Sequence, residues 1–281
     1  MRRVEAGSPR LALTHRDGSF GAISARCNHV GGPLDEGHID GEHLRCAYHG
    51  LEFDAGGVCV RIPGQERIPP AACVRTFPVV ERDQLVWIWM GDSEKADSTT
   101  IVSNPEHSDP TWSWEPHYMH IKSNWQLLVD NILDLTHLAY IHAKTIGGTP
   151  EAHFNADVAV ESDAQKVTLL RKMPNSVPPK LYIDAGGFKG NVDRWQRVEY
   201  QPAGGNVLRV NAGACDVNTG AYDGRRDNGF VLVNMHGVTP ETESTTHYLW
   251  TICTNVPRET GVPAVMFDQI YKTICEDEAV L

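Results

Sequence analysis

One apolar segment, residues 124–142, constrains the fold more than any other stretch of the sequence. It reads NWQLLVDNILDLTHLAYIH, and its apolar side chains recur at helical spacing: Trp125, Leu128, Val129, Ile132, Leu133 and Leu135. Asn131, Asp134 and His137 are three apart, so a continuous helix would place them on one face. Buried polar groups are costly unless they are paired or bound. A bend or helix end after His137 would bring its imidazole and that of His142 to one point.

Two neutral imidazoles and one carboxylate, with coordination positions left open, are typical of a non-haem Fe(II) site for oxygen chemistry. His137 and His142 can supply the imidazoles. Asp134 can be a third ligand or an acceptor that orients one imidazole. An ordinary core helix with two hydrogen-bonded histidines is the alternative, and this segment alone leaves both open.

A second group of metal-binding residue types lies upstream, in residues 27–50, CNHVGGPLDEGHIDGEHLRCAYHG. It holds Cys27-x-His29 and, after sixteen intervening residues, Cys46-x2-His49. Two thiolates and two imidazoles in this order are typical of a Rieske [2Fe–2S] centre, where Cys holds one iron and His the other. The rival is a structural zinc site, but zinc fingers usually pair Cys with Cys and His with His. The mixed halves therefore favour the Rieske centre.

Composition limits the class of protein. The chain has 281 residues, of which 41% are hydrophobic and 22% charged, and its net charge is −11. This acidity argues against nucleic acid or an anionic membrane as a partner and suits a basic partner protein. The seven cysteines form no secreted disulfide framework, and we find no signal peptide and no apolar run long enough to span a membrane. We therefore expect a cytoplasmic enzyme.

The remaining pattern is mostly β. LALTH and FGAISA around Asp17-Gly18 predict a hairpin, and CVRTFPVVERDQLVWIWMG predicts two strands. The polar run 91–100 predicts a domain boundary near residue 95, followed by a loop rich in Trp, Pro and His over 104–117. Alternating segments beyond Gly147-Gly148 predict an antiparallel sheet, and residues 263–281 a final helix. The predicted strands are ADVAVESD, KVTLLRK, KLYIDAGG, DRWQRVEYQP, NVLRVNAGA, GFVLVNMHGVTP and THYLWTICTN.

Taken together, these motifs resemble the oxygenase component of Rieske non-haem iron oxygenases, in particular the vanillate O-demethylase and dicamba monooxygenase group. The matching pieces span nearly the whole chain: Cys27-x-His29 with Cys46-x2-His49, Asn124-Trp125, Asp130-Asn131, Asp134-x2-His137-x4-His142, Asp193-Arg194-Trp195, residues 239–243, His247-Tyr248-x-Trp250 and Glu276-Asp277. The resemblance implies an α+β chain. Residues 1–95 would be an all-β Rieske domain, and residues 96–281 a helix-grip-like (START-type) catalytic domain.

The resemblance also implies roles for single residues. Asp277 would join His137 and His142 as the third Fe(II) ligand, and Asn131 would lie beside the iron. Asp134 would link the iron site to a cluster histidine of a neighbouring subunit in a homotrimer. Asn211 and His236 match positions that contact the substrate's polar groups, although each could instead be a strand residue with a local partner.

The activity implied is that of a terminal oxygenase. Electrons from NAD(P)H would arrive through a separate flavin and iron–sulfur reductase or a ferredoxin, because no Gly-rich nucleotide fingerprint occurs here. With O2, the enzyme would O-demethylate or hydroxylate a small, aromatic, carboxylated substrate. Ring cis-dihydroxylation, a Rieske ferredoxin-type electron carrier and a zinc-stabilised binding protein are the alternatives. Relatives extend beyond both ends of this chain, so we expect it to be truncated.

Overall fold

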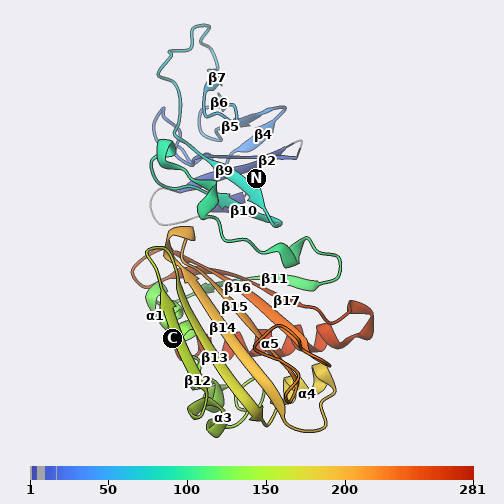
Figure 1. Cartoon of the computed structure of the whole chain (residues 1–281). Helices are drawn as coiled ribbons and strands as arrows, with labels where there is room; N and C mark the ends of the chain where they lie inside the picture. Colours follow the sequence, from blue (N-terminus) through green and yellow to red (C-terminus); the bar gives the residue numbers. More distant parts are fainter. Residues whose placement is uncertain (1, 5–9, 17) are drawn as a thin grey trace. The chain divides into compact units, whose positions relative to one another are not determined.

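The computed structural model describes residues 2–4, 10–16 and 18–281, and the chain forms two compact units, Met1–Ile101 and Val102–Leu281 (Figure 1). The boundary expected near residue 95 falls between two short 3-10 helices at the end of the first unit, η1 (Ser93–Lys95) and η2 (Ser98–Thr100). We describe each unit by itself.

The first unit is built from short strands in three small sheets. One sheet has the order β1-β2-β3-β8, a second β4-β5-β6-β7, and a third pairs β9 with β10. The predicted hairpin is β2 paired with β3, although Asp17 in its turn lies outside the described residues. The strands are β1 (Arg2–Val4), β2 (Leu11–Arg16), β3 (Ser19–Ser24), β4 (His38–Asp40), β5 (His43–Arg45), β6 (Glu52–Phe53), β7 (Cys59–Arg61), β8 (Thr76–Phe77), β9 (Val79–Arg82) and β10 (Leu85–Ile88).

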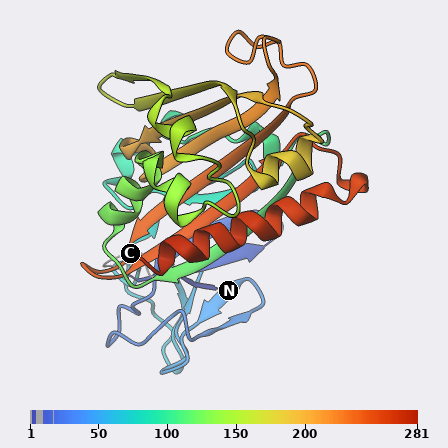
Figure 2. The ribbon, with the colours of Figure 1, turned by 90° about the horizontal axis from the view of Figure 1, so that it is seen from below.

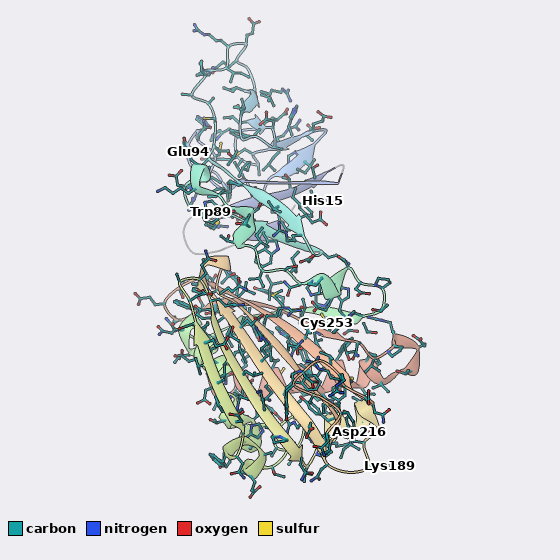
Figure 3. All side chains as sticks on the ribbon, viewed as in Figure 1. His15, Trp89, Glu94, Lys189, Asp216 and Cys253 are labelled. Atoms are coloured by element: carbon teal, nitrogen blue, oxygen red, sulfur yellow. The ribbon has the colours of Figure 1, made fainter. Side chains whose placement is uncertain are left out.

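The second unit is organised by one seven-stranded antiparallel sheet of order β11-β17-β16-β15-β14-β13-β12. From β12 to β17 each strand pairs with the next in the chain, and β11 closes the order on β17. Asp216 at the end of β15 and Lys189, in the loop before β14, lie at the same end of this sheet (Figure 3). The strands are β11 (Ser113–Ile121), β12 (Asp157–Ser162), β13 (Val167–Ser176), β14 (Val192–Gln201), β15 (Val207–Asp216), β16 (Phe230–Pro240) and β17 (Thr246–Thr254).

Two local predictions in this unit were wrong. KLYIDAGG is not a strand but helix α4 (Lys180–Gly186), which begins after Pro179 and ends at Gly187 in the left-handed region, with φ 67°. Seven residues are too few for helical periodicity to outweigh the β-branched and aromatic pattern. The loop expected over 104–117 contains most of β11. Prolines such as Pro116 favour a loop over a strand. An edge strand tolerates proline, however, because one of its sides needs no ladder hydrogen bond.

The helices of the second unit lie on one face of the sheet, and Figure 2 shows α5 running along that face. One apolar core joins the two layers, with Ile132 of α1, Tyr182 of α4 and Ile270 of α5 packed with Leu232 and Trp250 of the sheet. None of the described residues belongs to a helix long and apolar enough to cross a membrane. The helices are α1 (Trp125–Leu133), α2 (Leu138–Ile141), α3 (Pro150–Phe154), α4 and α5 (Val262–Glu278), with 3-10 turns η3 (Pro105–His107), η4 (Leu135–His137), η5 (Pro202–Gly204) and η6 (Arg258–Thr260).

Candidate metal centres and pocket

The segment 124–142 is not one continuous helix, and its interruption positions His137 and His142. Helix α1 ends at Leu133, and Asp134 leaves the helical region with φ −99° and ψ 91°. The Asp134 carboxylate then accepts hydrogen bonds from the backbone N–H and hydroxyl of Thr136, at 3.0 and 2.6 Å, and so caps η4. We expected the interruption after His137. It occurs three residues earlier, because Asp134 is a good capping residue at a point where the helix can stop.

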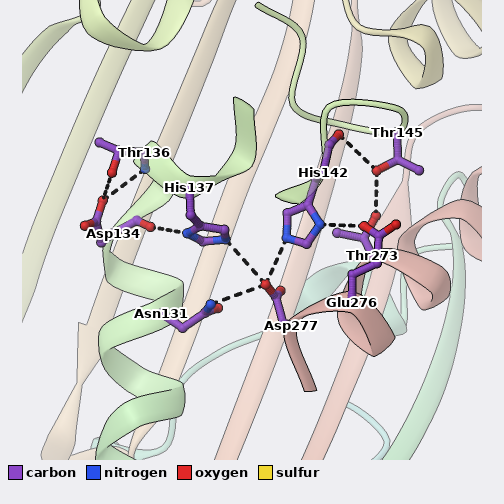
Figure 4. A network of polar contacts seen from close by, with 9 residues as sticks. All are labelled: Asn131, Asp134, Thr136, His137, His142, Thr145, Thr273, Glu276 and Asp277. Atoms are coloured by element: carbon purple, nitrogen blue, oxygen red, sulfur yellow. Dashed lines mark hydrogen bonds and ion pairs between the residues drawn. The ribbon is translucent and has the colours of Figure 1, made fainter. Parts of the chain in front are cut away.

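Three side chains converge beside this break, His137, His142 and Asp277 (Figure 4). One ligand atom from each lies within 4.8 Å of the other two. The Asp277 Oδ1 atom is 3.5 Å from Nε2 of His137 and 2.9 Å from Nε2 of His142. Two imidazole nitrogens and one carboxylate oxygen facing a common point are the donor set of a non-haem Fe(II) site. The residues present therefore fit that ion.

The far nitrogen of each imidazole is held by a second group. Nδ1 of His137 donates to the backbone oxygen of Asp134 at 2.5 Å, and Nδ1 of His142 lies 2.7 Å from a carboxylate oxygen of Glu276. Asn131 donates from Nδ2 to Asp277 Oδ1 at 3.3 Å. Such partners fix the tautomer and leave Nε2 available as the ligand. Asp134 thus acts on His137 through its backbone, while its exposed carboxylate points elsewhere.

Helix α5 delivers Asp277 as the last member of its buried stripe. Pro263, Met266, Phe267, Ile270, Thr273 and Ile274 precede it at spacings of three and one. Of the three neighbouring acids, Asp277 faces the histidines, Glu276 contacts His142, and Glu278 is exposed. The three adjacent carboxylates therefore have different positions.

Burial lowers the pKa of His142, but its hydrogen bonds to Asp277 and Glu276 outweigh this and raise the pKa overall. When the ring is protonated, its Nε2–H donates to the Asp277 carboxylate at 2.9 Å. A divalent cation bound by the same atoms would replace that proton, which is the usual exchange at a histidine–carboxylate metal site.

The loop after His142 leaves no room for a side chain at Gly147. A Cβ on Gly147 would lie 2.0 Å from the backbone oxygen of Leu138, and the Gly147 N–H donates to the backbone oxygen of His142 at 2.9 Å. The hydroxyl of Thr273 on α5 donates to that of Thr145 at 3.1 Å, which ties the loop to the helix carrying Asp277 (Figure 4). The contact between the loop and α5 therefore keeps the side chains of His142 and Asp277 next to each other.

A pocket opens from this site between the helices and the sheet. Most of its wall is apolar, and among the described residues no lysine or arginine lines it. The lining residues are Asn131, Ile132, Leu135, His137, Leu138, Ile146, Tyr182, Gln196, Val210, Ala212, Leu232, Asn234, His236, Ile270, Thr273, Ile274 and Asp277. An apolar cavity with a few polar groups and a metal donor set is typical of a site for a small organic molecule.

His236 is in the pocket wall, whereas Asn211 is not. Nδ1 of His236 lies 2.6 Å from the hydroxyl of Tyr248, and burial lowers the pKa of His236 to about 4, so the ring is neutral. Asn211 accepts a hydrogen bond from Nε1 of Trp195 at 2.8 Å. Its neighbours Val210 and Ala212 line the pocket, so Asn211 points to the opposite face of the sheet. For Asn211, the local-partner alternative describes the structure.

Gln196 and Asn234 line the pocket, and sequence reasoning missed both. A signal existed: Asn234 is two residues from His236 on one strand, so the two side chains share a face. Finding Gln196 required the register, which places it opposite Ala212, with Ala212 opposite Leu232.

The cluster motif of the first unit forms two matching loops. The N–H of Cys27 donates to the oxygen of Gly32, and the N–H of Cys46 to that of Leu51, at 2.9 and 2.8 Å. Gly31 and Gly50 complete the two turns with φ 76° and 73°. Two copies of one turn therefore present the thiols and imidazoles toward each other.

The four side chains of these loops fit a [2Fe–2S] cluster. Cys27 and Cys46 are buried, His29 and His49 are exposed, and the two imidazole rings lie 4.6 Å apart. Burial raises the pKa of Cys27 to about 11, and the Cys46 thiol adds to this. The Cys27 thiol, buried against that of Cys46, becomes a thiolate only when cations compensate its charge, as the irons of a cluster do.

Comparison with known proteins finds a matching family model for each half of the chain. Residues 1–78 match the Rieske [2Fe-2S] domain, and residues 121–281 match the vanillate O-demethylase oxygenase C-terminal domain. The chain is 40% identical over 248 residues to the iron–sulfur subunit of the toluene-4-sulfonate monooxygenase system of Comamonas testosteroni, covering 88% of this chain and 71% of that protein. It is 31% identical to a vanillate O-demethylase oxygenase subunit of a Pseudomonas strain, covering 85% and 68%.

A solved structure is similar as well. The crystal structure of dicamba monooxygenase with non-haem iron and dicamba superimposes with a TM-score of 0.75 at 29% identity, covering 90% of this chain and 71% of that one. These matches confirm the expected α+β fold, the Rieske and non-haem iron cofactors, and an enzyme of the monooxygenase type. Such oxygenase components belong to multicomponent systems that need a separate reductase or ferredoxin and act on small molecules. The chain belongs to the family of Rieske non-haem iron oxygenases, as the oxygenase component of a monooxygenase.

Proposed function

We propose that this oxygenase hydroxylates a methyl or O-methyl carbon of a small aromatic acid. The convergence of His137, His142 and Asp277 at the wall of an apolar pocket is the observation that carries the proposal. One oxygen atom of O2 enters the C–H bond, and the other leaves as water with two electrons and two protons. A hydroxylated O-methyl group then leaves as formaldehyde.

In this proposal, His137, His142 and Asp277 hold Fe(II) by the atoms that face each other. Iron bound there supplies the activation of O2 with electrons received through the [2Fe–2S] centre. Glu276 and the backbone oxygen of Asp134 keep the two imidazoles oriented, and the Asn131 amide holds the Asp277 carboxylate. The apolar wall binds the aromatic ring and excludes water.

Residues 1–95 form the electron-carrying domain in this proposal, and residues 96–281 the oxygenating one. Cys27, Cys46, His29 and His49 hold the cluster, with the imidazoles at the surface, where electrons can pass to another protein. The donor is an NAD(P)H-dependent flavin and iron–sulfur reductase or a ferredoxin.

We further propose a homotrimer in which Asp134 links the iron site to a cluster histidine of a neighbour. The Asp134 side chain is exposed, and hydrogen bonds from Thr136 lower the pKa of its carboxyl, so it is ionised. Its backbone oxygen bonds His137, so it connects the surface to a proposed iron ligand.

The proposed substrate class draws on two observations. In the neutral tautomer of His236 whose Nδ1 accepts from the Tyr248 hydroxyl, Nε2 carries the proton and can donate a hydrogen bond to an acceptor in the pocket. In addition, relatives are named for toluene-4-sulfonate and vanillate, both aromatic anions. Together they favour an aromatic ring with one anionic group.

The test is anaerobic purification, followed by metal and acid-labile sulfide analysis, EPR of the reduced chain, and a screen of methoxybenzoates and toluene-4-sulfonate with a surrogate reductase. We expect three irons per chain, a Rieske-type signal, and formaldehyde or a benzylic alcohol. A cis-diol product would replace monooxygenation with ring dihydroxylation. A cluster without the third iron would reduce the chain to an electron carrier.

A further inference from the structure

Behind the pocket wall lies a buried arginine that no carboxylate neutralises within ion-pair distance among the described residues. Arg171 on β13 is 3% exposed. Its Nη1 donates to Oε1 of Gln196 at 3.2 Å and to Nδ1 of His153 at 3.3 Å, and its Nη2 to the backbone oxygen of His153 at 3.0 Å. Fully buried Arg194 lies nearby, bonded to the backbone oxygens of Ile146 and Gly147. Two buried positive charges therefore lie beside the pocket with neutral groups as their hydrogen-bond partners, and the Asp134 carboxylate acts on Arg171 from beyond ion-pair distance.

The guanidinium of Arg171 fixes the direction of each hydrogen bond in this series. It can only donate, so Gln196 must turn its carbonyl oxygen toward Arg171, and His153 must accept at Nδ1. His153 then carries its proton on Nε2 and donates to the backbone oxygen of Gly147 at 2.7 Å. The amide NH2 of Gln196 is left without a role in the contact with Arg171, and Gln196 lines the pocket. Nothing in the described part of the chain accepts a hydrogen bond from it.

We infer that Gln196 is a specificity-determining residue: its amide, set by Arg171, donates a hydrogen bond to an anionic oxygen of the substrate. This inference rests on the proposed function and assigns the contact that recognises the acid group. Arg171 is a positioning residue, because it orients the amide without lining the pocket.

The donors of the pocket support a carboxylate or sulfonate. Such a group carries two or three acceptor oxygens, while His236 offers one N–H, in the tautomer whose Nδ1 accepts from Tyr248. Gln196 supplies further donors, polarised by the charged guanidinium behind it. Ala212 lies between Gln196 and Leu232 in the sheet, and its small side chain leaves space over that strand. A buried positive charge is costly when unpaired, and a bound anion would offset that cost for Arg171 and Arg194.

The test measures binding rather than turnover. Calorimetry on the iron-loaded, oxidised protein under nitrogen would compare 4-methoxybenzoate with 4-methoxybenzamide, its neutral analogue. The wild type should bind the acid at least about 10-fold more tightly. Gln196→Glu keeps the contact with Arg171 but turns an acceptor into the pocket, so the acid should bind about 100-fold more weakly, while the amide changes about threefold or less. Gln196→Met should lower acid affinity by about 10-fold.

Gln201→Glu, at the end of the same strand and outside the pocket, is the matched control and should leave both affinities unchanged. Equal losses for acid and amide in Gln196→Glu, or a wild type that binds the acid no better than the amide or binds neither, would overturn the inference. If the preference holds but no acid yields formaldehyde or an alcohol, the proposed function fails and this binding role stands.

Discussion

The two metal-binding regions of this chain are built in opposite ways. The proposed cluster ligands lie within residues 27–49, on two copies of one turn, with the imidazoles exposed. The proposed iron ligands come from positions 137, 142 and 277, and His142 and Asp277 are buried between helices and sheet. The first arrangement suits electron exchange with another protein. The second suits a reaction that must exclude water. Solvent access to the metal, as much as ligand type, therefore distinguishes electron transfer from oxygen chemistry.

The largest expected effect comes from removing one proposed ligand from each region, which tests whether the two metal sites are independent. Asp277→Ala should abolish the mononuclear iron and lower turnover by well over about 100-fold, since loss of an outer-shell partner alone costs 10–100-fold. The Rieske EPR signal should remain. Cys46→Ser should do the reverse and lose acid-labile sulfide while the second unit stays folded by circular dichroism. Loss of both metals from either variant would contradict independent sites.

Acid should weaken the second unit through His153. Burial lowers the pKa of His153 to about 4. The unfolded chain takes up this proton near pH 6.5 and the folded chain only near pH 4. The stabilisation is therefore complete above pH 6.5 and is lost as the pH falls through that window, by up to roughly 3 kcal/mol. Urea unfolding of the metal-free protein at several pH values measures it. His153→Gln should remove this part of the slope, and an unchanged slope would contradict the assignment.

A smaller effect should separate the neighbouring acids of α5. Glu276→Gln keeps the shape but removes the charge that orients His142, so iron affinity should fall by about 10- to 100-fold. Competition with a chelator reports the affinity. Exposed Glu278→Gln is the matched control, and an equal effect there would mean that charge near the site matters rather than contact with His142.

The smallest expected effect is on the outer face of the same helix. Lys272 pairs with Asp268 at 2.6 Å, and both side chains are mostly exposed. Lys272→Gln should change the free energy of unfolding by about 0.5 kcal/mol or less and leave iron content unchanged. A large loss of iron from this variant would show that α5 contributes more than its inward stripe.

The same contrast explains what the sequence could predict. The proposed cluster ligands could be picked out from spacing, because neighbouring residues build both loops. His137 and His142 were also visible, but the choice of Asp277 among three adjacent acids came from the resemblance. The break was placed after His137 because helical periodicity does not reveal that Asp134 caps a new turn.

The pocket was the least predictable part. The spacing of Asn234 from His236 indicated a shared face, whereas only the structure shows that Asn211 is bonded to Trp195 and lies outside the pocket wall. Strand β11 contains Pro116 and still forms, because it lies at the edge of the sheet. The short helix α4 begins directly after Pro179. These outcomes depend on long-range pairing, which local propensity does not encode.

The delivery of Asp277 by the last helix has a consequence for synthesis. The four cluster ligands leave the ribosome together, early in translation, and their unit can fold while the rest of the chain is still being made. The iron site stays incomplete until α5 has emerged and packed on the sheet. The order of the proposed ligands along the chain thus separates cluster assembly from iron loading in time. The electron-carrying unit can be complete before the oxygen-reacting site can bind its iron.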